Sequence, residues 1–231
     1  MFIQLSAGDA HTCGLKLNQQ VVCWGMLPSA PAGLYLQISA GSSHTCALTH
    51  ESAVVCWGDT VHGKCDAPPG YDFVQVAAGN SFSCGLRRNG LPECWGKNHM
   101  GQTSPPAGVQ MRQISASSTD HACGIAAGDH AEGSILDSDL VCWGRNSFGE
   151  AQPQRDGPWR QVTCGHWSTC AIRDEIGAEC WGKRSTVLAE EEYDELVVSW
   201  DHACGATMDG DMVCWGDADG PEKVPEGFML A

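Results

Sequence analysis

Short apolar runs alternate with segments rich in turn-forming residues along the whole chain. LYLQI at 34–38 and YDFVQV at 71–76 are two such runs, and each follows a linker that contains Pro and Gly. Helical repeats would need longer stretches with a 3.6-residue period, which the sequence lacks. Several short strands per unit, punctuated by Gly and Pro, are typical of a β-propeller or another repeated sheet. The pattern therefore predicts an all-β fold.

The runs belong to a repeat unit that occurs six times. The unit is clearest in SAGDAHTCGLKLNQQVVCWG at 6–25, and it returns at 39–58 and 77–96. Three further copies at 115–144, 163–182 and 197–216 carry a longer middle, a lost His and a lost Gly, respectively. The repeats predict one propeller domain over 1–231, because stacked repeats share a continuous core. Its six units lie near 1–33, 34–70, 71–108, 109–157, 158–192 and 193–231.

Each unit carries two cysteines at a spacing that suits a hairpin. If residues 11–25 fold about Asn18, Cys13 lies opposite Cys23, with Cβ atoms roughly 4.5–5.5 Å apart, where a cross-strand disulfide is feasible. Five units keep the ten-residue spacing, and the nine extra residues of the fourth can loop out at the hairpin tip at little entropic cost. The predicted bridges are Cys13–Cys23, Cys46–Cys56, Cys84–Cys94, Cys123–Cys142, Cys170–Cys180 and Cys204–Cys214.

The same hairpin explains the residues next to the cysteines. A small residue follows the first cysteine of every unit, and Trp follows the second. In the first unit Gly14 faces Val22 and Thr12 faces Trp24, so the small residue leaves room for a large indole nearby. We interpret the repeated Trp as packing between blades, because one such ring can bury roughly 150–250 Å².

Metal and redox roles for the cysteines are disfavoured. Structural zinc sites use C-x₂₋₄-C spacing and thioredoxin-like chemistry uses C-x-x-C, and neither occurs here. We therefore expect no metal site and no cofactor. Cys65 and Cys164 remain, and they can pair with each other, pair with another chain or stay free; mutual pairing is least favoured, because a ring separates the second and fifth units. Twelve paired cysteines predict an oxidising compartment, hence an extracellular or secreted protein.

The net charge of the chain disfavours some classes of binding partner. Only 13 Lys and Arg oppose 28 Asp and Glu, and the formal net charge is −15. Such a surface disfavours nucleic acid and anionic membranes as partners. No run of about 18 apolar residues occurs, and MFIQLSAG lacks the basic start and apolar stretch of a secretory signal. We therefore expect a soluble, mature form with no membrane insertion.

The longest form of the motif, AGNSFSCGLRRNGLPECWGKNHMGQ at 78–102, resembles the repeat of the regulator-of-chromosome-condensation (RCC1) family. It is more similar to the cysteine-containing extracellular branch, which includes Crinkly-type receptor ectodomains and the propeller-type β-lactamase inhibitor protein. The resemblance implies a β-propeller of four-stranded blades, commonly seven. Six units here favour a closed six-bladed ring with an irregular seam, since MFIQLSAG and the C-terminal GFMLA both copy a blade's first strand; the alternative is part of a seven-bladed ring.

Function is expected in residues that differ between units, because loops on a rigid scaffold carry binding sites. Large side chains at irregular positions are frequent interface anchors. They predict a non-catalytic module that binds a protein partner. The candidate binding residues are His99, Met100, Phe148, Trp159, His166, Trp167 and Trp200. The alternative for the three tryptophans is core packing, and the insertion at 126–139 is either a recognition loop or tolerated surface length.

Two other classes of function stay open. A carbohydrate-binding, lectin-like propeller would use aromatic platforms, although no recurring residue set resembles such a pocket. An enzyme could gather carboxylates at the centre of the ring, because 189–196 and 209–220 are rich in Asp and Glu. No catalytic fingerprint occurs, so catalysis is disfavoured. A nuclear exchange factor fits poorly with the acidic charge and the paired cysteines.

Overall fold

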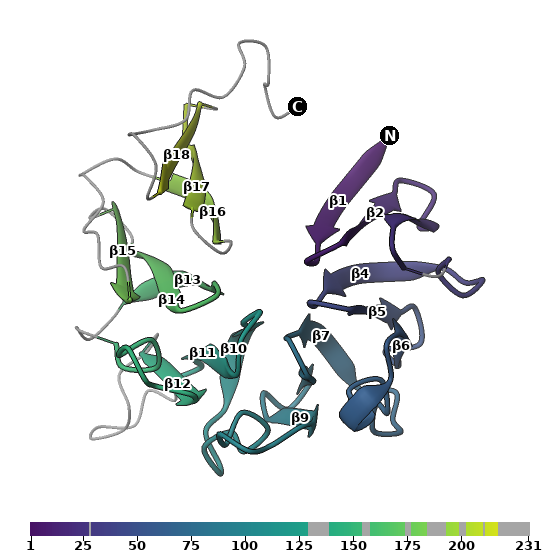
Figure 1. Cartoon of the computed structure of the whole chain (residues 1–231), viewed down its shortest axis with the longest axis horizontal. Helices are drawn as coiled ribbons and strands as arrows, with labels where there is room; N and C mark the ends of the chain where they lie inside the picture. The colour runs from purple at the N-terminus through teal and green to yellow at the C-terminus, as the bar shows by residue number, and fades with distance from the viewer. Residues whose placement is uncertain are drawn as a thin grey trace.

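The computed structural model describes residues 1–27, 29–128, 139–153, 158–173, 177–183, 193–198, 202–209 and 211–216. Within these residues, six three-stranded antiparallel sheets follow one another in chain order around a common centre (Figure 1). The first three sheets are β1 (Phe2–Ala7), β2 (His11–Lys16) and β3 (Val21–Gly25); β4 (Tyr35–Ala40), β5 (His44–Thr49) and β6 (Val54–Gly58); and β7 (Phe73–Ala78), β8 (Phe82–Arg87) and β9 (Pro92–Gly96).

The last three sheets repeat this plan. They are β10 (Met111–Ala116), β11 (His121–Ala126) and β12 (Leu140–Gly144); β13 (Trp159–Cys164), β14 (Ser168–Arg173) and β15 (Gly177–Gly182); and β16 (Tyr193–Val198), β17 (His202–Thr207) and β18 (Met212–Gly216). A short 3₁₀ turn, η1 (Val61–Gly63), lies in the linker after β6. No helix in the described part of the chain is long and apolar enough to cross a membrane.

The predicted hairpin register and the six disulfides are confirmed. Cys13 pairs with Cys23 and Thr12 with Trp24 in the ladder between β2 and β3. The other five sheets keep this register, including the fourth, where Cys123 faces Cys142 across the insertion. All six predicted bridges are formed, one in each sheet. Most of the insertion, 129–138, lies outside the described residues.

The expectation of four strands per blade is wrong for the described residues, which contain three strands in every sheet. The linkers that follow the third strands at 59–72 and 97–110 form turns and bends instead of a fourth strand. Paired prolines occur in both linkers, Pro68–Pro69 and Pro105–Pro106. Proline has no N–H for a ladder, so these segments pair poorly as strands.

The small residue after the first cysteine has a different neighbour from the one we expected. A Cβ atom at Gly85 would lie 2.6 Å from the ring of Phe73, the first residue of the same sheet, and 3.5 Å from Trp95. The space next to Gly85 is therefore occupied mainly by the ring of Phe73, and the indole of Trp95 lies farther away. The Trp side chains do pack between sheets: Trp57 shares a core cluster with Cys13 and Leu15 of the preceding sheet.

A glutamine in the first strand joins each sheet to the next. Gln75 donates from Nε2 to Ile114 O (2.9 Å) and accepts the Ile114 N–H at Oε1 (2.9 Å). Gln4, Gln113 and Gln161 make the same pair of bonds to the backbone of the following sheet. A register shift in the first strand precedes each glutamine. We call this pair of bonds the glutamine clamp.

The first sheet differs from the others because, among the described residues, no other sheet packs against its outer face. Its apolar side chains Phe2, Leu5 and Trp24 are 44 %, 61 % and 47 % exposed, whereas Tyr35 and Trp57, the equivalents of Phe2 and Trp24, are 2 % and 7 % exposed. The first and last sheets lie on either side of an opening in the ring (Figure 1). Residues 217–231, which include the C-terminal strand copy, lie outside the described part, so closure of the ring stays a prediction.

Candidate binding site

The candidate residues are placed in three different situations. Trp159 lies in the core, 1 % exposed, with its ring centroid 6.1 Å from that of Trp181, so the core-packing alternative describes it and it offers no surface for a partner. Trp200 lies outside the described residues. His99 and Met100 lie on the linker after β9, and Phe148, His166 and Trp167 come together between the fourth and fifth sheets.

Three aromatic side chains meet at this junction. Phe148 is on the linker after β12, and His166 and Trp167 form part of the turn between β13 and β14. The ring centroids of Phe148 and Trp167 are 5.7 Å apart, and those of His166 and Trp167 are 4.2 Å apart. Phe148 is 43 % exposed. The cluster thus presents aromatic surface to solvent.

Two cations flank the rings. Lys183 Nζ lies 4.0 Å from the centroid of the Trp167 ring and 5.6 Å from that of Phe148. The guanidinium carbon of Arg145 lies 5.5 Å from Phe148 and 5.9 Å from Trp167. These separations are within the range of cation–π attraction. We call Arg145, Phe148, His166, Trp167 and Lys183 the aromatic–cationic patch.

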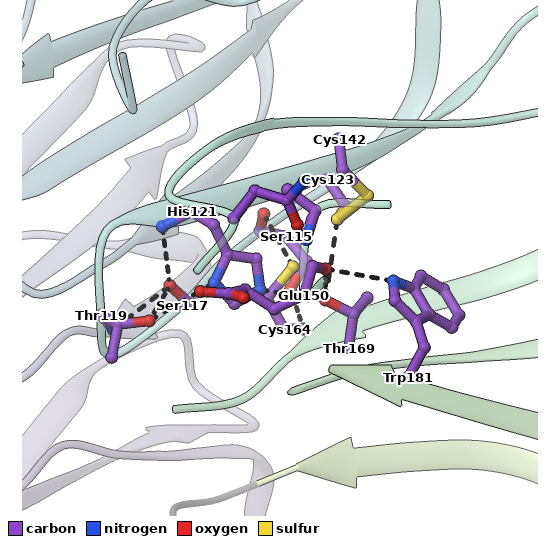
Figure 2. The surroundings of a disulfide bond; sticks show 12 residues. Ser115, Ser117, Thr119, His121, Cys123, Cys142, Glu150, Cys164, Thr169 and Trp181 are labelled. Carbon is purple, nitrogen blue, oxygen red and sulfur yellow. Dashed lines mark hydrogen bonds between the residues drawn. A yellow bond between two sulfur atoms is a disulfide. The ribbon is translucent and has the colours of Figure 1, made fainter. Parts of the chain in front are cut away.

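A buried carboxylate holds the Phe148 linker in place. Glu150 is fully buried, and its Oε2 accepts the Phe148 N–H at 2.6 Å. Its Oε1 lies 3.6 Å from Nε of Arg145. The backbone carbonyl of Glu150 accepts bonds from the Thr169 hydroxyl (2.8 Å) and from Trp181 Nε1 (3.1 Å) of the next sheet. The hydrogen bonds among Glu150, Thr169 and Trp181, which Figure 2 shows, thus tie the linker that carries Phe148 to the fifth sheet.

The repeat explains why these segments meet. In the preceding unit the equivalent linker also contacts the next turn, but through polar groups: Gln102 Nε2 donates to Asp120 Oδ1 (2.9 Å). His99 Nε2 lies 3.4 Å from Asp120 Oδ2 in the same contact. Trp167 occupies the turn position of Asp120, and Phe148 that of Met100. The repeat thus places the linker of one unit against the turn of the next. Between the fourth and fifth units, aromatic rings make this contact.

The patch carries positive charge on an acidic chain. Burial lowers the pKa of His166; Asp9 opposes this shift, while Arg145 and Lys183 lower the pKa further, so the imidazole is neutral near pH 7. The positive charge comes from Lys183, which is exposed, and from Arg145, whose side chain is 23 % exposed. Rings flanked by cations favour a ligand that combines negative charge with a flat or apolar group.

Sequence reasoning missed both cations. Arg145 and Lys183 directly follow the CWG triplets of the fourth and fifth units, where the second unit has Asp59. A comparison of this one position across the repeats would have found them. The candidates Phe148, His166 and Trp167 were nominated separately, and only the structure shows that they adjoin.

A second cluster lies in the core between the fourth and fifth sheets. Ligand atoms of His121, Cys123 and Cys164 lie within 4.8 Å of one another, and all three residues are buried. The Cys123 sulfur is bonded to Cys142, so it is not the thiolate that binds metals. Cys164 and Cys65 are both free cysteines. The cluster is a thiol beside a disulfide rather than a set of metal ligands.

A shallow hollow of about 500 Å³ lies along the first strands of the second, third and fourth sheets. Residues that line it include Gln37, Gln75, Gln113 and Arg112. The residues that line it are amides, apolar side chains and Arg112. The acidic segments 189–196 and 209–220, which sequence analysis nominated for a carboxylate-lined centre, lie partly outside the described residues.

Comparisons with known proteins agree with this architecture. The family model for the regulator of chromosome condensation (RCC1) repeat matches residues 2–26, 36–64 and 73–102. The crystal structure of the CRINKLY WD40 ectodomain from the Arabidopsis thaliana receptor kinase ACR4 is similar, with 27 % identity and a TM-score of 0.77 over 97 % of this chain and 82 % of that chain. No curated protein matches the chain.

Two further solved structures are similar. The entire ectodomain of the Physcomitrella patens receptor kinase CR4 has 28 % identity and a TM-score of 0.75; the match covers 93 % of this chain and 61 % of that chain, less than two thirds of its length. Human WBSCR16, at 18 % identity and a TM-score of 0.75 over 94 % of this chain and 76 % of that chain, supports the fold alone. Three segments of the chain thus match the RCC1 repeat, and the chain has a disulfide-bonded, propeller-like fold similar to that of Crinkly receptor ectodomains.

Proposed function

We propose that the chain is an extracellular or cell-surface recognition module that binds an acidic segment of a partner protein through the aromatic–cationic patch. The observation that carries the proposal is the convergence of Phe148, Trp167, Arg145 and Lys183 at a junction that is polar in the preceding unit. Six disulfides and the likeness to receptor ectodomains support an extracellular location.

The patch has the features of an interface anchor. Aromatic residues and Arg are enriched among residues that dominate binding energy. The patch rests on two rigid sheets, so little ordering entropy is lost when a partner docks. The chain has a net charge of −15, so the surface outside the patch repels an acidic partner. This repulsion favours the orientation in which the partner docks on the cationic patch.

The proposal is tested with defined probes. Wild-type protein is immobilised, and binding is measured for a peptide of alternating Glu and Tyr, a matched peptide of alternating Lys and Tyr, and a panel of neutral and sulfated glycans. We expect the Glu–Tyr peptide to bind and its affinity to fall with salt. Trp167→Ala should weaken binding by about 2 kcal/mol and Lys183→Glu by about tenfold, or about 1.4 kcal/mol.

Lys97→Glu is the matched control. Lys97 directly follows the CWG triplet of the third unit, as Lys183 does in the fifth, so the substitution makes the same charge change away from the rings. Binding that falls equally in Lys97→Glu and Lys183→Glu would reflect net charge alone and would contradict the proposal. Preferential binding of glycans, lost in Trp167→Ala, would favour the lectin-like alternative.

A further inference from the structure

The residue that ends the first strand of a sheet shares a core cluster with the disulfide of the sheet before it. Ala78 lies in one cluster with Cys46, Ala116 in another with Cys84, and Val198 in another with Cys170. These positions bring an inert side chain to the bridge. In the fifth sheet the same position is Cys164, which shares a cluster with Cys123.

Cys164 therefore places a thiol against a disulfide. Its Sγ lies within 4.8 Å of Cys123 Sγ, and the residue is 7 % exposed. Figure 2 shows the thiol together with the Cys123–Cys142 bridge, His121 and Thr169. The Cys164 N–H donates to Ser115 Oγ at 3.0 Å, and the thiol lies 3.6 Å from Ser115 O, so both backbone and side chain are held at the bridge.

We propose that Cys164 is an alternative disulfide partner of Cys123, so that this site exchanges a bridge within the fourth sheet for a bridge between the fourth and fifth sheets. The Cys164 thiolate attacks Cys123 Sγ, a bond forms between these two sulfurs, and the bond from Cys123 to Cys142 breaks. The electron pair leaves on Cys142 Sγ, which takes up a proton. One thiol and one disulfide are consumed, and one new thiol and one new disulfide are formed. The step therefore needs no oxidant or reductant.

Burial of the Cys164 thiol in the folded protein protects the Cys123–Cys142 bridge from attack. Burial raises the pKa of the Cys164 thiol to about 12, which keeps the attacking sulfur protonated. Thiolate is the reactive form, so exchange is slow until the joint between the sheets opens.

Cys142 precedes Arg145 and Phe148 on the chain, and Cys164 precedes His166 and Trp167. The exchange thus acts between the two segments that carry the patch, although it does not depend on the proposed binding function.

The test removes the present partner of Cys123. Cys142→Ala and Cys94→Ala are each refolded in a buffer of reduced and oxidised glutathione, with Cys65→Ser in both backgrounds, and their disulfides are mapped by non-reducing peptide mass spectrometry. We expect Cys142→Ala to form Cys123–Cys164. Cys94→Ala is the matched control, because Cys84 then faces Ala116 and should stay free or capped by glutathione.

A folded Cys142→Ala in which Cys123 and Cys164 both remain free or glutathione-capped would overturn the proposal. A second measurement covers failure to fold. Wild-type protein is incubated with a low concentration of reduced glutathione at pH 8.5, quenched with acid, alkylated and mapped. We expect the Cys123–Cys164 peptide and alkylated Cys142 in the wild type, and loss of both in Cys164→Ala. Their absence from the wild type would equally overturn the proposal.

Discussion

Three histidines are buried at joints between the described sheets: His11, whose Nε2 lies 2.9 Å from Thr45 Oγ1, and the more deeply buried His44 and His121. His44 and His121 begin the middle strands of the second and fourth sheets, and both are 0 % exposed. His44 Nε2 lies 2.8 Å from Ser83 Oγ, whose hydroxyl donates to Lys64 O, so the ring nitrogen is the donor. His121 makes the equivalent bond to Thr169, whose hydroxyl donates to Glu150 O. Both rings are therefore held as neutral Nε2–H tautomers.

These histidines should make the protein sensitive to acid. Burial, helped by Lys64 at His44 and by Arg145 at His121, lowers the pKa of each ring from 6.5 to about 3. Between these values the unfolded chain binds more protons than the folded chain, so stability falls as the pH falls. The loss should approach about 1.4 kcal/mol per pH unit for each ring. Chemical denaturation at a series of pH values from 7 to 4 measures it.

A natural replacement gives the control for this pH dependence. Phe82 occupies the equivalent position in the third unit, so His44→Phe keeps a fully buried ring that cannot be protonated. We expect this variant to lose the contribution of His44 to the slope, which approaches about 1.4 kcal/mol per pH unit. Comparison with the wild type cancels the carboxylates that titrate in the same range. An unchanged slope would show that His44 protonation does not drive acid unfolding.

At the scale of the elements, the glutamine clamp sets how the sheets are joined. Strand alternation alone puts Gln75 on the same face of β7 as Phe73 and Ala77, and nothing in a single strand says that its amide bonds to the next sheet. The residue recurs as Gln4, Gln37, Gln113 and Gln161, whereas the sixth sheet has Glu195 at this position. A carboxylate still accepts a bond from a backbone N–H but cannot donate to the carbonyl.

Removal of one clamp should weaken the joint between two sheets. Gln75→Ala leaves the Ile114 N–H and C=O without their side-chain partners, and we expect a loss of about 2 kcal/mol of folding free energy. Gln75→Glu should cost less near pH 7, because it keeps the acceptor. Gln110→Ala, at an exposed glutamine of the neighbouring linker, is the control. Equal denaturation midpoints for Gln75→Ala and Gln110→Ala would show that the clamp adds no stability.

At the scale of the whole molecule, stability depends on short covalent loops within each sheet. Five bridges span ten residues and one spans nineteen. Each such loop contributes about 2–3 kcal/mol by restricting the unfolded chain. Together they are comparable to or larger than the about 5–15 kcal/mol net stability of a typical domain.

Complete reduction should therefore unfold the chain at 25 °C. Tryptophan fluorescence and near-ultraviolet circular dichroism are followed as a phosphine reductant is added, and alkylation counts the thiols released. We expect the signals of the buried tryptophans to disappear once several bridges are open. Cys84→Ala/Cys94→Ala, which lacks a single bridge, should stay folded without reductant. Native spectra after all twelve bridged cysteines are alkylated would contradict this prediction.

The repeat count, the hairpin register and the six disulfides were predictable from the sequence because the partners are near neighbours in the chain. Cys13 and Cys23 are ten residues apart, so one turn position determines their pairing. The same local rules nominated Phe148 and Trp167 as unusual side chains. The four-strand expectation, by contrast, came from family resemblance and not from strand patterns in the linkers.

Contacts between sheets were decided only by the tertiary structure. The clamp between Gln75 and Ile114 joins residues 39 apart, and the bond between Cys164 and Ser115 joins residues 49 apart. Hydrophobic periodicity shows which face of a strand is buried but not which side chain of another unit lies against it. The meeting of Phe148 with Trp167, and of Cys164 with a disulfide, follows from how successive sheets pack around the centre.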